Sequence, residues 1–302
     1  MGPRFRLYDA RSHPAPRESI TSLLQAIILG IVQGLTEFAP VSSSGHLILV
    51  PWLFHWPILG NEALNKTFDV ALHIGTFVGA VAFFRRDIVT YLAAWGRSIR
   101  ARAIRGTKER LAWALVIGTL PGAVVGAVAE DVIEDRLGAP WLIAVMLAVF
   151  GVVLYGVDRL APRRREIDDI RMSDGLLIGL AQAVALQPGV SRSGVTITAA
   201  RGLGLKSEDA ARFSFLLSLP IIGGAGLFKG LKLLTGSERI PPGFGAPFAF
   251  GMLASAVSGF LVIWALLAYL RRKDFAPFML YRLAAAGLVL GVIGSGLRPG
   301  TI

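Results

Sequence analysis

The chain reads Pro40-Val-Ser-Ser-Ser-Gly45 in the middle of one apolar stretch and Gly189-Val-Ser-Arg-Ser-Gly194 in the middle of another. The first stretch covers 20–54 and the second covers 175–205. A membrane-spanning helix needs about 20 predominantly apolar residues, and a polar, glycine-containing loop halfway along divides each stretch into two half-length helices. Each stretch is therefore predicted to be a re-entrant helical hairpin and not a simple span.

The two hairpins repeat one sequence pattern. Gly30-Ile-Val-Gln33 precedes the first loop, Gly179-Leu-Ala-Gln182 precedes the second, and matching residues are 149 positions apart in a chain of 302 residues. Broken helices in corresponding positions of two repeats usually mark the ligand site of a membrane protein. The two loops are therefore predicted to meet near the middle of the membrane and to form one site.

Six further segments are long and apolar enough to span the membrane: 68–84, 111–128, 141–157, 209–234, 244–270 and 276–297. Each repeat then contains one hairpin and three spans, and because three is odd the second repeat must be inverted relative to the first. The predicted fold is an all-α integral membrane protein built as an inverted repeat. Repeat 1 covers about 20–157 and repeat 2 about 175–297 of a single membrane domain, 20–302, which follows a basic N-terminal tail, 1–19.

Composition supports a membrane protein and argues against other classes. Hydrophobic residues make up 54% of the chain and charged residues 17%, against about 25% charged residues in soluble domains. The formal net charge is +11, but the basic residues lie in short segments between apolar runs. Membrane proteins show such a bias on their cytoplasmic side, so no nucleic-acid binding is expected. The absence of cysteine excludes disulfides, thiolate metal sites and a cysteine nucleophile.

Loop charge predicts the orientation. The expected loop 85–110 carries eight Lys and Arg against two acids, so it is placed in the cytoplasm, whereas the expected loop 129–140 carries four acids and one arginine, so it is placed outside. Alternation of the spans then opens the first hairpin to the outside and the second to the cytoplasm.

The first loop contains the polar groups for a site inside the membrane. Gln33 and Glu37 lie four residues apart and share one helix face. The serine run 42–44 precedes a half-helix predicted to begin at His46, and the second loop places Arg192 before a half-helix predicted to begin near Val195. Serine before an apolar run caps a helix, and helix N-termini bind anions. The two loops therefore predict a phosphate site.

Charge at the bilayer centre is costly, about 2.5–3.5 kcal/mol for an ionised group, so Glu37 and Arg192 are functional candidates. The structural alternative is that the two pair with each other and stabilise the bundle, which leaves the serines and His46 unexplained. His73 and Asp69 flank an apolar span, and helix packing or lumen contact is favoured over a site role for both.

The loops resemble those of the bacterial undecaprenyl-diphosphate phosphatase family of the bacitracin-resistance type. Gln33-Gly-Leu-Thr-Glu37 followed by Pro40-Val-Ser-Ser-Ser-Gly-His46 is similar to the first family signature, and Pro188 to Thr196 is similar to the second. The resemblance covers about 20–297. The chain carries Gln33 where the family allows glutamate or glutamine, so a metal site there has one carboxylate fewer.

The resemblance implies hydrolysis of undecaprenyl diphosphate to undecaprenyl phosphate and inorganic phosphate, which recycles the lipid carrier of peptidoglycan synthesis. It implies a bacterial inner-membrane protein whose partners are this lipid and the membrane, with a homodimer left open. Because the first hairpin is predicted to open to the outside, the site is expected to face the outer, periplasmic side. A lipid-carrier flippase or transporter remains the alternative because inverted broken-helix repeats suit alternating access. A purely structural scaffold fits the buried charges poorly.

The residue roles follow from the same resemblance. Ser43 and His46 are expected to supply nucleophile and base, or His46 alone acts, together with Glu37 and Arg192 in catalysis. Glu37 and the neutral Gln33 are expected to hold Mg²⁺ or Ca²⁺, since hard cations prefer oxygen ligands. The residues expected to bind the substrate are Ser42, Ser44, Gly45, Gly189, Ser191, Ser193 and Thr196.

Overall fold

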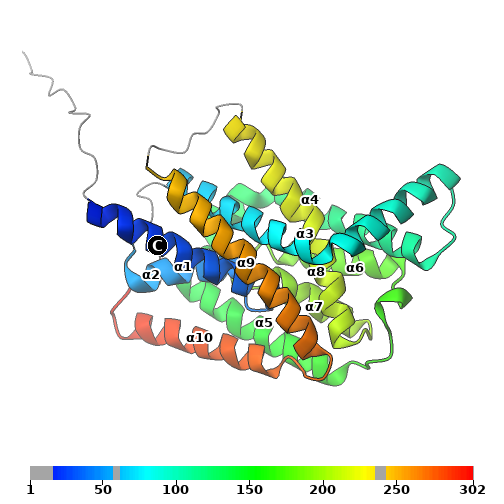
Figure 1. Cartoon of the computed structure of the whole chain (residues 1–302). Coiled ribbons are helices and arrows are strands. Elements are labelled where there is room, and N and C mark those ends of the chain that lie inside the picture. Colours follow the sequence, from blue (N-terminus) through cyan, green and yellow to red (C-terminus); the bar gives the residue numbers. More distant parts are fainter. Residues whose placement is uncertain (1–15, 57–61, 235–242, 302) are drawn as a thin grey trace, which may run out of the picture.

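The computed structural model describes residues 16–56, 62–234 and 243–301, and within these ranges the protein is helical and has no strand of more than one residue. The helices are α1 (Pro16–Phe38), α2 (Ser43–Phe54), α3 (Glu62–Ala101), α4 (Thr107–Leu137), α5 (Pro140–Leu160), α6 (Met172–Val184), α7 (Arg192–Gly202), α8 (Ser207–Leu234), α9 (Gly245–Leu270) and α10 (Ala276–Gly294), with one 3-10 turn at Ile167–Asp169. Figure 1 shows them as one bundle. Most of the predicted tail, 1–19, lies outside the described residues, and α1 begins four residues before the predicted boundary.

The six predicted spans are confirmed as the six long apolar helices α3, α4, α5, α8, α9 and α10. Two predicted loops are wrong in extent. Residues 85–101 continue α3 beyond the predicted end of the span, with a kink at Phe84, whose φ of −90° and ψ of 15° are not helical. Residues 129–137 continue α4. Charge marks where a helix leaves the apolar layer, but charged residues such as Lys, Arg and Glu are good helix formers, so the helix continues.

The two predicted breaks are also present, between α1 and α2 and between α6 and α7, but both second helices begin three residues earlier than predicted. The N-caps are Ser42 and Ser191, at positions 149 apart, and their side chains accept hydrogen bonds from the N–H groups of Gly45 and Gly194. Both serines have positive φ, 74° and 77°, which is uncommon for residues with a side chain. The same strained backbone therefore occurs in both loops.

Each broken pair packs against a helix of the other half of the chain. Helix α1 packs along α9, and α6 packs along α4 (Figure 1). Glycines permit the approach: a Cβ atom at Gly30 would lie 2.3 Å from the Gly251 carbonyl oxygen, and a Cβ atom at Gly179 would lie 2.2 Å from the Gly118 carbonyl oxygen. Small residues are the usual contact between membrane helices because they let the backbones approach closely.

Polar contacts show where the hairpin ends lie. Arg165, which follows α5, pairs with Asp174 in the first turn of α6 and donates to the Leu203 carbonyl just after α7, at 3.0 Å. The outer ends of α6 and α7 therefore lie together beside the end of α5. The end of α2 lies elsewhere, where Trp52 Nε1 donates to the Pro299 carbonyl at 3.1 Å.

The glycine contact between α6 and α4 is expected to limit stability. Gly179→Ala is expected to destabilise the protein by about 1–3 kcal/mol, because the new methyl group meets backbone atoms of Gly118 that cannot move separately. Gly156→Ala in α5 is the control, since nothing lies within 4 Å of a Cβ atom there, and it is expected to be neutral or to stabilise by up to about 1 kcal/mol. Thermal unfolding in detergent measures both, and equal melting temperatures would contradict the packing argument.

Candidate active site

The two loops are bonded directly to each other. Ser42 Oγ accepts a hydrogen bond from the backbone N–H of Gly189 at 3.0 Å, and Ser193 Oγ donates to the Ala39 carbonyl at 3.0 Å. Because Ser42 also caps α2, the N-terminus of that helix is fixed against the loop before α7. The predicted meeting of the two loops is therefore present, and it brings two helix N-termini, which attract anions, into one place.

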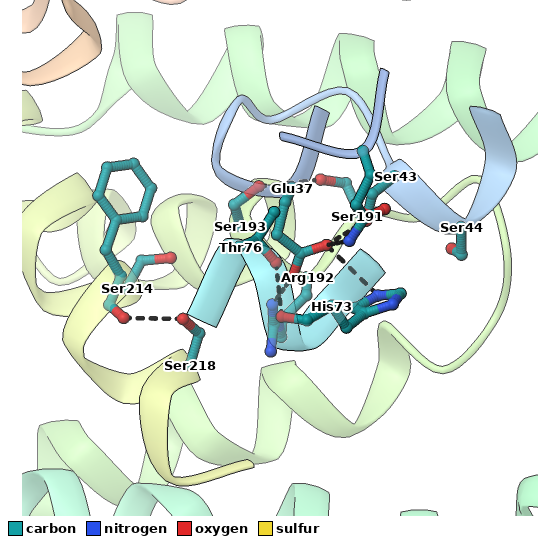
Figure 2. Close-up of polar contacts among 12 residues, drawn as sticks. Glu37, Ser43, Ser44, His73, Thr76, Ser191, Arg192, Ser193, Ser214 and Ser218 are labelled. Carbon is teal, nitrogen blue, oxygen red and sulfur yellow. Dashed lines mark hydrogen bonds and ion pairs between the residues drawn. The ribbon is translucent and has the colours of Figure 1, made fainter. Parts of the chain in front are cut away.

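The carboxylate of Glu37 lies at the centre of the polar contacts between the loops, and its side chain is only 3% exposed (Figure 2). Its Oε1 pairs with Arg192, which is the first residue of α7. Its Oε2 accepts hydrogen bonds from Ser43 Oγ at 2.5 Å and from Gln33 Nε2 at 2.9 Å. The serine hydroxyl is thus held by a carboxylate that can take its proton.

The alternative that Glu37 and Arg192 simply pair with each other is partly true. The ion pair is present, and Arg192 keeps 19% of its side chain exposed, against 3% for Glu37. A buried pair of this kind is weak evidence for stability, because the desolvation of both charges offsets much of the attraction. The pair also occurs beside Ser43, which a stabilising ion pair does not need. The arrangement therefore suits an arginine that exchanges Glu37 for an incoming phosphate.

The expected contact between Ser43 and His46 does not form. His46 Nδ1 lies 2.7 Å from the Ser42 carbonyl oxygen, and His46 Nε2 lies 2.7 Å from the hydroxyl of Tyr281 in α10. A carbonyl only accepts, so Nδ1 must carry a proton and a neutral ring accepts the Tyr281 hydroxyl at Nε2. Spacing of three residues predicted contact, but the two side chains bond to different groups: Ser43 Oγ donates to Glu37, whereas His46 contacts the Ser42 carbonyl and the Tyr281 hydroxyl.

A different histidine faces the carboxylate. His73 in α3 places Nε2 3.5 Å from Glu37 Oε2, and its Nδ1 lies 2.7 Å from the Asp69 carbonyl oxygen. Figure 2 shows the ring beside Glu37. Helix packing or lumen contact was favoured for His73 from the sequence, and the structure places its ring beside Glu37. The available signal was an ionisable side chain inside an apolar span.

The other predicted residues of the second loop make hydrogen bonds within that loop. Ser191 Oγ lies 3.2 Å from Ser193 Oγ and accepts from the N–H of Gly194 at 3.1 Å. The first loop repeats this with Ser42 and Ser44, whose hydroxyls lie 3.5 Å apart. Two N-capping serines with matching partners show that both helix N-termini are built in the same way.

Helix α8 contributes residues that sequence analysis did not assign to the site. Thr196 points to α8, where its hydroxyl lies 2.6 Å from Ser214 Oγ. Ser214 and Ser218 line a small pocket together with Glu37 and Arg192, and Figure 2 shows them on the side of the site away from Ser44. Their separation of four residues places both hydroxyls on one face of α8.

The donor set suits a hard cation that shares its ligands with a phosphate. Glu37 supplies one carboxylate, and Gln33 Oε1 is a buried oxygen without a hydrogen-bond partner among the described residues. In the same residues no cluster of three or more acids, histidines or cysteines could hold a metal alone. Mg²⁺ is commonly held by one or two carboxylates and by substrate phosphates, so the residues present fit that mode and not a closed protein cage.

Comparison with known proteins agrees with these features. Residues 26–288 match the family model described as bacitracin resistance protein BacA. The chain is 46% identical over 277 residues to an undecaprenyl-diphosphatase of Pelobacter propionicus, covering 91% of this chain and 99% of that protein. It is 49% identical over 280 residues to an undecaprenyl-diphosphatase of Pelotomaculum thermopropionicum, covering 92% of this chain and 99% of that protein.

Proposed function

The chain belongs to the bacitracin resistance protein BacA family, and from this premise we propose that it removes the terminal phosphate of undecaprenyl diphosphate. The products are undecaprenyl phosphate and inorganic phosphate, and the reaction returns the lipid carrier to cell-wall synthesis. The observation that carries the proposal for the site is the hydrogen bond from Ser43 to Glu37 beside Arg192, between two helix N-termini. The flippase alternative is not favoured, because the relatives are named as diphosphatases.

The substrate would enter where Arg192 now meets Glu37. The guanidinium and the N–H groups at the starts of α2 and α7 bind the diphosphate, since a planar guanidinium matches two phosphate oxygens. Ser214 and Ser218 offer further hydroxyl donors in the same pocket. The binding groups neutralise charge at the phosphate that will be attacked, which is the main way in which proteins accelerate phosphoryl transfer.

Ser43 Oγ is proposed as the nucleophile and Glu37 as its base. The Ser43 proton passes to Glu37 Oε2, Oγ bonds to the terminal phosphorus, and the bond from that phosphorus to the bridging oxygen breaks and releases undecaprenyl phosphate. Glu37 gives this proton to the departing oxygen of undecaprenyl phosphate and is a carboxylate again. A water molecule then attacks the phosphorus of the phosphoserine and gives its proton to Glu37. The bond from phosphorus to Oγ breaks, Glu37 returns the proton to Oγ, and inorganic phosphate leaves with Ser43 restored. A serine hydroxyl is a weak nucleophile until a base takes its proton, and Glu37 is the base in contact with it.

An assay of phosphate release distinguishes a diphosphatase from a lipid transporter. Purified protein in detergent with undecaprenyl diphosphate is expected to release inorganic phosphate, and the same protein with Glu37→Gln is expected to release almost none. A transporter that moves the lipid without chemistry would release no phosphate in either form. Phosphate release by the wild-type protein at the level of the empty detergent preparation would refute the proposed function.

A divalent cation is proposed as the cofactor, held by Glu37 and the unpartnered oxygen of Gln33. When bound, Mg²⁺ or Ca²⁺ would offset charge on the diphosphate oxygens. Gln33→Ala is expected to raise the cation concentration for half-maximal activity by about tenfold, and to reduce the thermal stabilisation by cation plus inorganic diphosphate. Gln182→Ala is the control, because Gln182 occupies the matching position of the second hairpin. Equal cation dependence in the two variants would contradict the assignment.

The two halves are proposed to form an inverted repeat in the bacterial inner membrane, with the site opening to the outer side. The exchanged packing of α1 on α9 and α6 on α4 supports it, as do the matching N-caps. A homodimer stays a prediction.

Labelling of single cysteines in this cysteine-free chain tests the inversion. His55→Cys, just after α2, is expected to react from the outside, because the first hairpin opens there. Arg171→Cys, just before α6, and Ile104→Cys, between α3 and α4, are expected to react from the cytoplasm; all three positions are exposed. Membrane-impermeant maleimide on cells and on inverted vesicles gives the side. Reaction of residues 55 and 171 from the same side would contradict an inverted repeat.

A further inference from the structure

A second arginine lies behind the two loops and has no role in the reaction described above. Arg282 in α10 is fully buried, and it makes no ion pair with a carboxylate among the described residues. Helix α10 packs along α5 (Figure 1). A buried guanidinium without a carboxylate is unusual because its charge remains uncompensated.

The guanidinium of Arg282 donates its hydrogen bonds to backbone carbonyls, and these bonds join three segments. One nitrogen donates to the Pro40 carbonyl of the first loop at 3.0 Å. Another donates to the carbonyls of Gly189 and Val190 in the second loop, at 2.8 and 3.1 Å. The third segment is α5, whose carbonyls at Met146 and Leu147 accept at 3.2 and 2.8 Å.

The surroundings are shaped around this side chain. A Cβ atom at Gly151 in α5 would lie 3.2 Å from Arg282 Cβ and 3.3 Å from its Cδ, so glycine leaves room for the arginine stem. A Cβ atom at Gly194 would lie 3.1 Å from Arg282 Nη1, so the guanidinium lies directly beside the first turn of α7. That turn begins with Arg192. The guanidinium therefore contacts the backbone that places the substrate-binding arginine.

We propose that Arg282 is the positioning residue of this site: it clamps the two loops in the register in which Ser43 and Arg192 face one phosphate, and its uncompensated charge favours a diphosphate anion in front of them. Lysine cannot reproduce this arrangement, because a single ammonium group lacks the planar fork that reaches three carbonyl groups on separate segments. The inference rests on the proposed function for its readout.

Without the guanidinium of Arg282 the two loops are expected to shift, and this shift is measured as a loss of kcat. Arg282→Lys is expected to lower kcat by about tenfold to a hundredfold, since small misplacements of reacting groups have effects of that size. Its KM and its affinity for inorganic diphosphate are expected to change little, because the charge is kept. Arg282→Met is expected to weaken inorganic diphosphate binding by about tenfold in addition, because a nearby fixed charge is removed.

Arg201→Lys is the matched control. Arg201 is also fully buried and also donates to backbone carbonyls, at Pro162 and Ala161, but it lies at the far end of α7 and pairs with Asp158. Its substitution is expected to reduce the amount of folded protein while kcat per folded molecule stays at the wild-type value. A merely structural role of Arg282 would give the same result for both substitutions.

A second variant tests the proposal without altering any charge or any residue of the site. Gly151→Ala presses on the stem of Arg282 and is expected to lower kcat by several-fold, whereas Gly156→Ala, on the same helix in open space, is expected to leave it unchanged.

In Arg282→Ala, added guanidinium ion below denaturing concentration is expected to restore part of kcat, with no such rescue in Arg201→Ala.

The outcomes are distinguishable. If the wild-type protein releases no phosphate, the proposed function fails. If the wild-type protein is active and Arg282→Lys keeps its kcat, or if Arg282→Lys and Arg201→Lys lose activity only in proportion to folded protein, the positioning role is overturned. Unchanged affinity of folded Arg282→Met for inorganic diphosphate, measured by calorimetry, would overturn the role of the charge.

Discussion

Substitution of Glu37 by glutamine is expected to reduce kcat by about 10³-fold, because the amide keeps the shape and the contact with Ser43 but cannot take its proton. Ser43→Ala is expected to be similarly inactive, because the nucleophile itself is removed. The double variant is expected to be little worse than either single variant, since residues that act as one unit do not have additive effects. Phosphate release by monodisperse protein at saturating substrate measures all three.

Loss of a buried carboxylate also affects stability, so the control must share that effect. Asp158 is buried and pairs with Arg201 and Arg163, away from the two loops. Asp158→Asn is expected to destabilise the protein by about 3–5 kcal/mol, as the breaking of a buried ion pair does, while kcat of the folded fraction is retained. Additive effects of Glu37→Gln and Ser43→Ala, or substantial turnover in Ser43→Ala, would show that Ser43 is not the nucleophile and that water or His46 is.

Arg192→Lys is expected to lose about a hundredfold or more in kcat/KM, although the charge is kept. A guanidinium presents two parallel N–H groups to two phosphate oxygens, and an ammonium group acts as a point charge. Inorganic diphosphate binding to the variant, followed by calorimetry, is expected to weaken together with turnover, because the same contact serves both.

Arg212→Lys provides the comparison for arginine chemistry in general. Arg212 contacts both carboxylate oxygens of Asp87 at 2.8 Å, outside the two loops, so its substitution is expected to leave kcat/KM unchanged. Near-wild-type turnover by Arg192→Lys would contradict a contact of the Arg192 guanidinium with two phosphate oxygens, whatever the result for Arg212.

The two histidines show how far sequence spacing carries a site assignment. His46 stands next to the loop serines in sequence, which predicted contact with Ser43, yet its ring stacks on Tyr281 and bonds to that hydroxyl. His73 lies far from the loops in sequence and faces Glu37. Residues three apart on a helix lie on neighbouring parts of its surface, but their bonds depend on the groups that other segments bring near. Ser43 meets Glu37 of α1, and His46 meets Tyr281 of α10. His46→Ala and Ser43→Ala are therefore not expected to act as one unit, because each side chain bonds to a different partner.

Composition and short-range pattern determined the six spans, the two broken helix pairs and the groups that line the loops. An apolar run of sufficient length has few structures open to it in a membrane, where every backbone group must bond within its own segment. A serine before such a run caps the helix by accepting a hydrogen bond from the backbone N–H three residues later. Ser42 and Ser191 do this in the two loops. These features are local, so the order of residues along the chain is enough to specify them.

Tertiary structure alone decided which distant groups share the site. His73 of α3 lies beside Glu37, and Arg282 reaches Pro40 across 242 positions of sequence. Such contacts depend on how closely helices approach, which is set by glycines such as Gly30 and Gly179 against the backbone of the other half. The hydrophobic periodicity of one segment does not indicate which face of a second helix will pack against it. Helix packing therefore placed His73 and Arg282 beside the loops, although both residues are far from the loops in sequence.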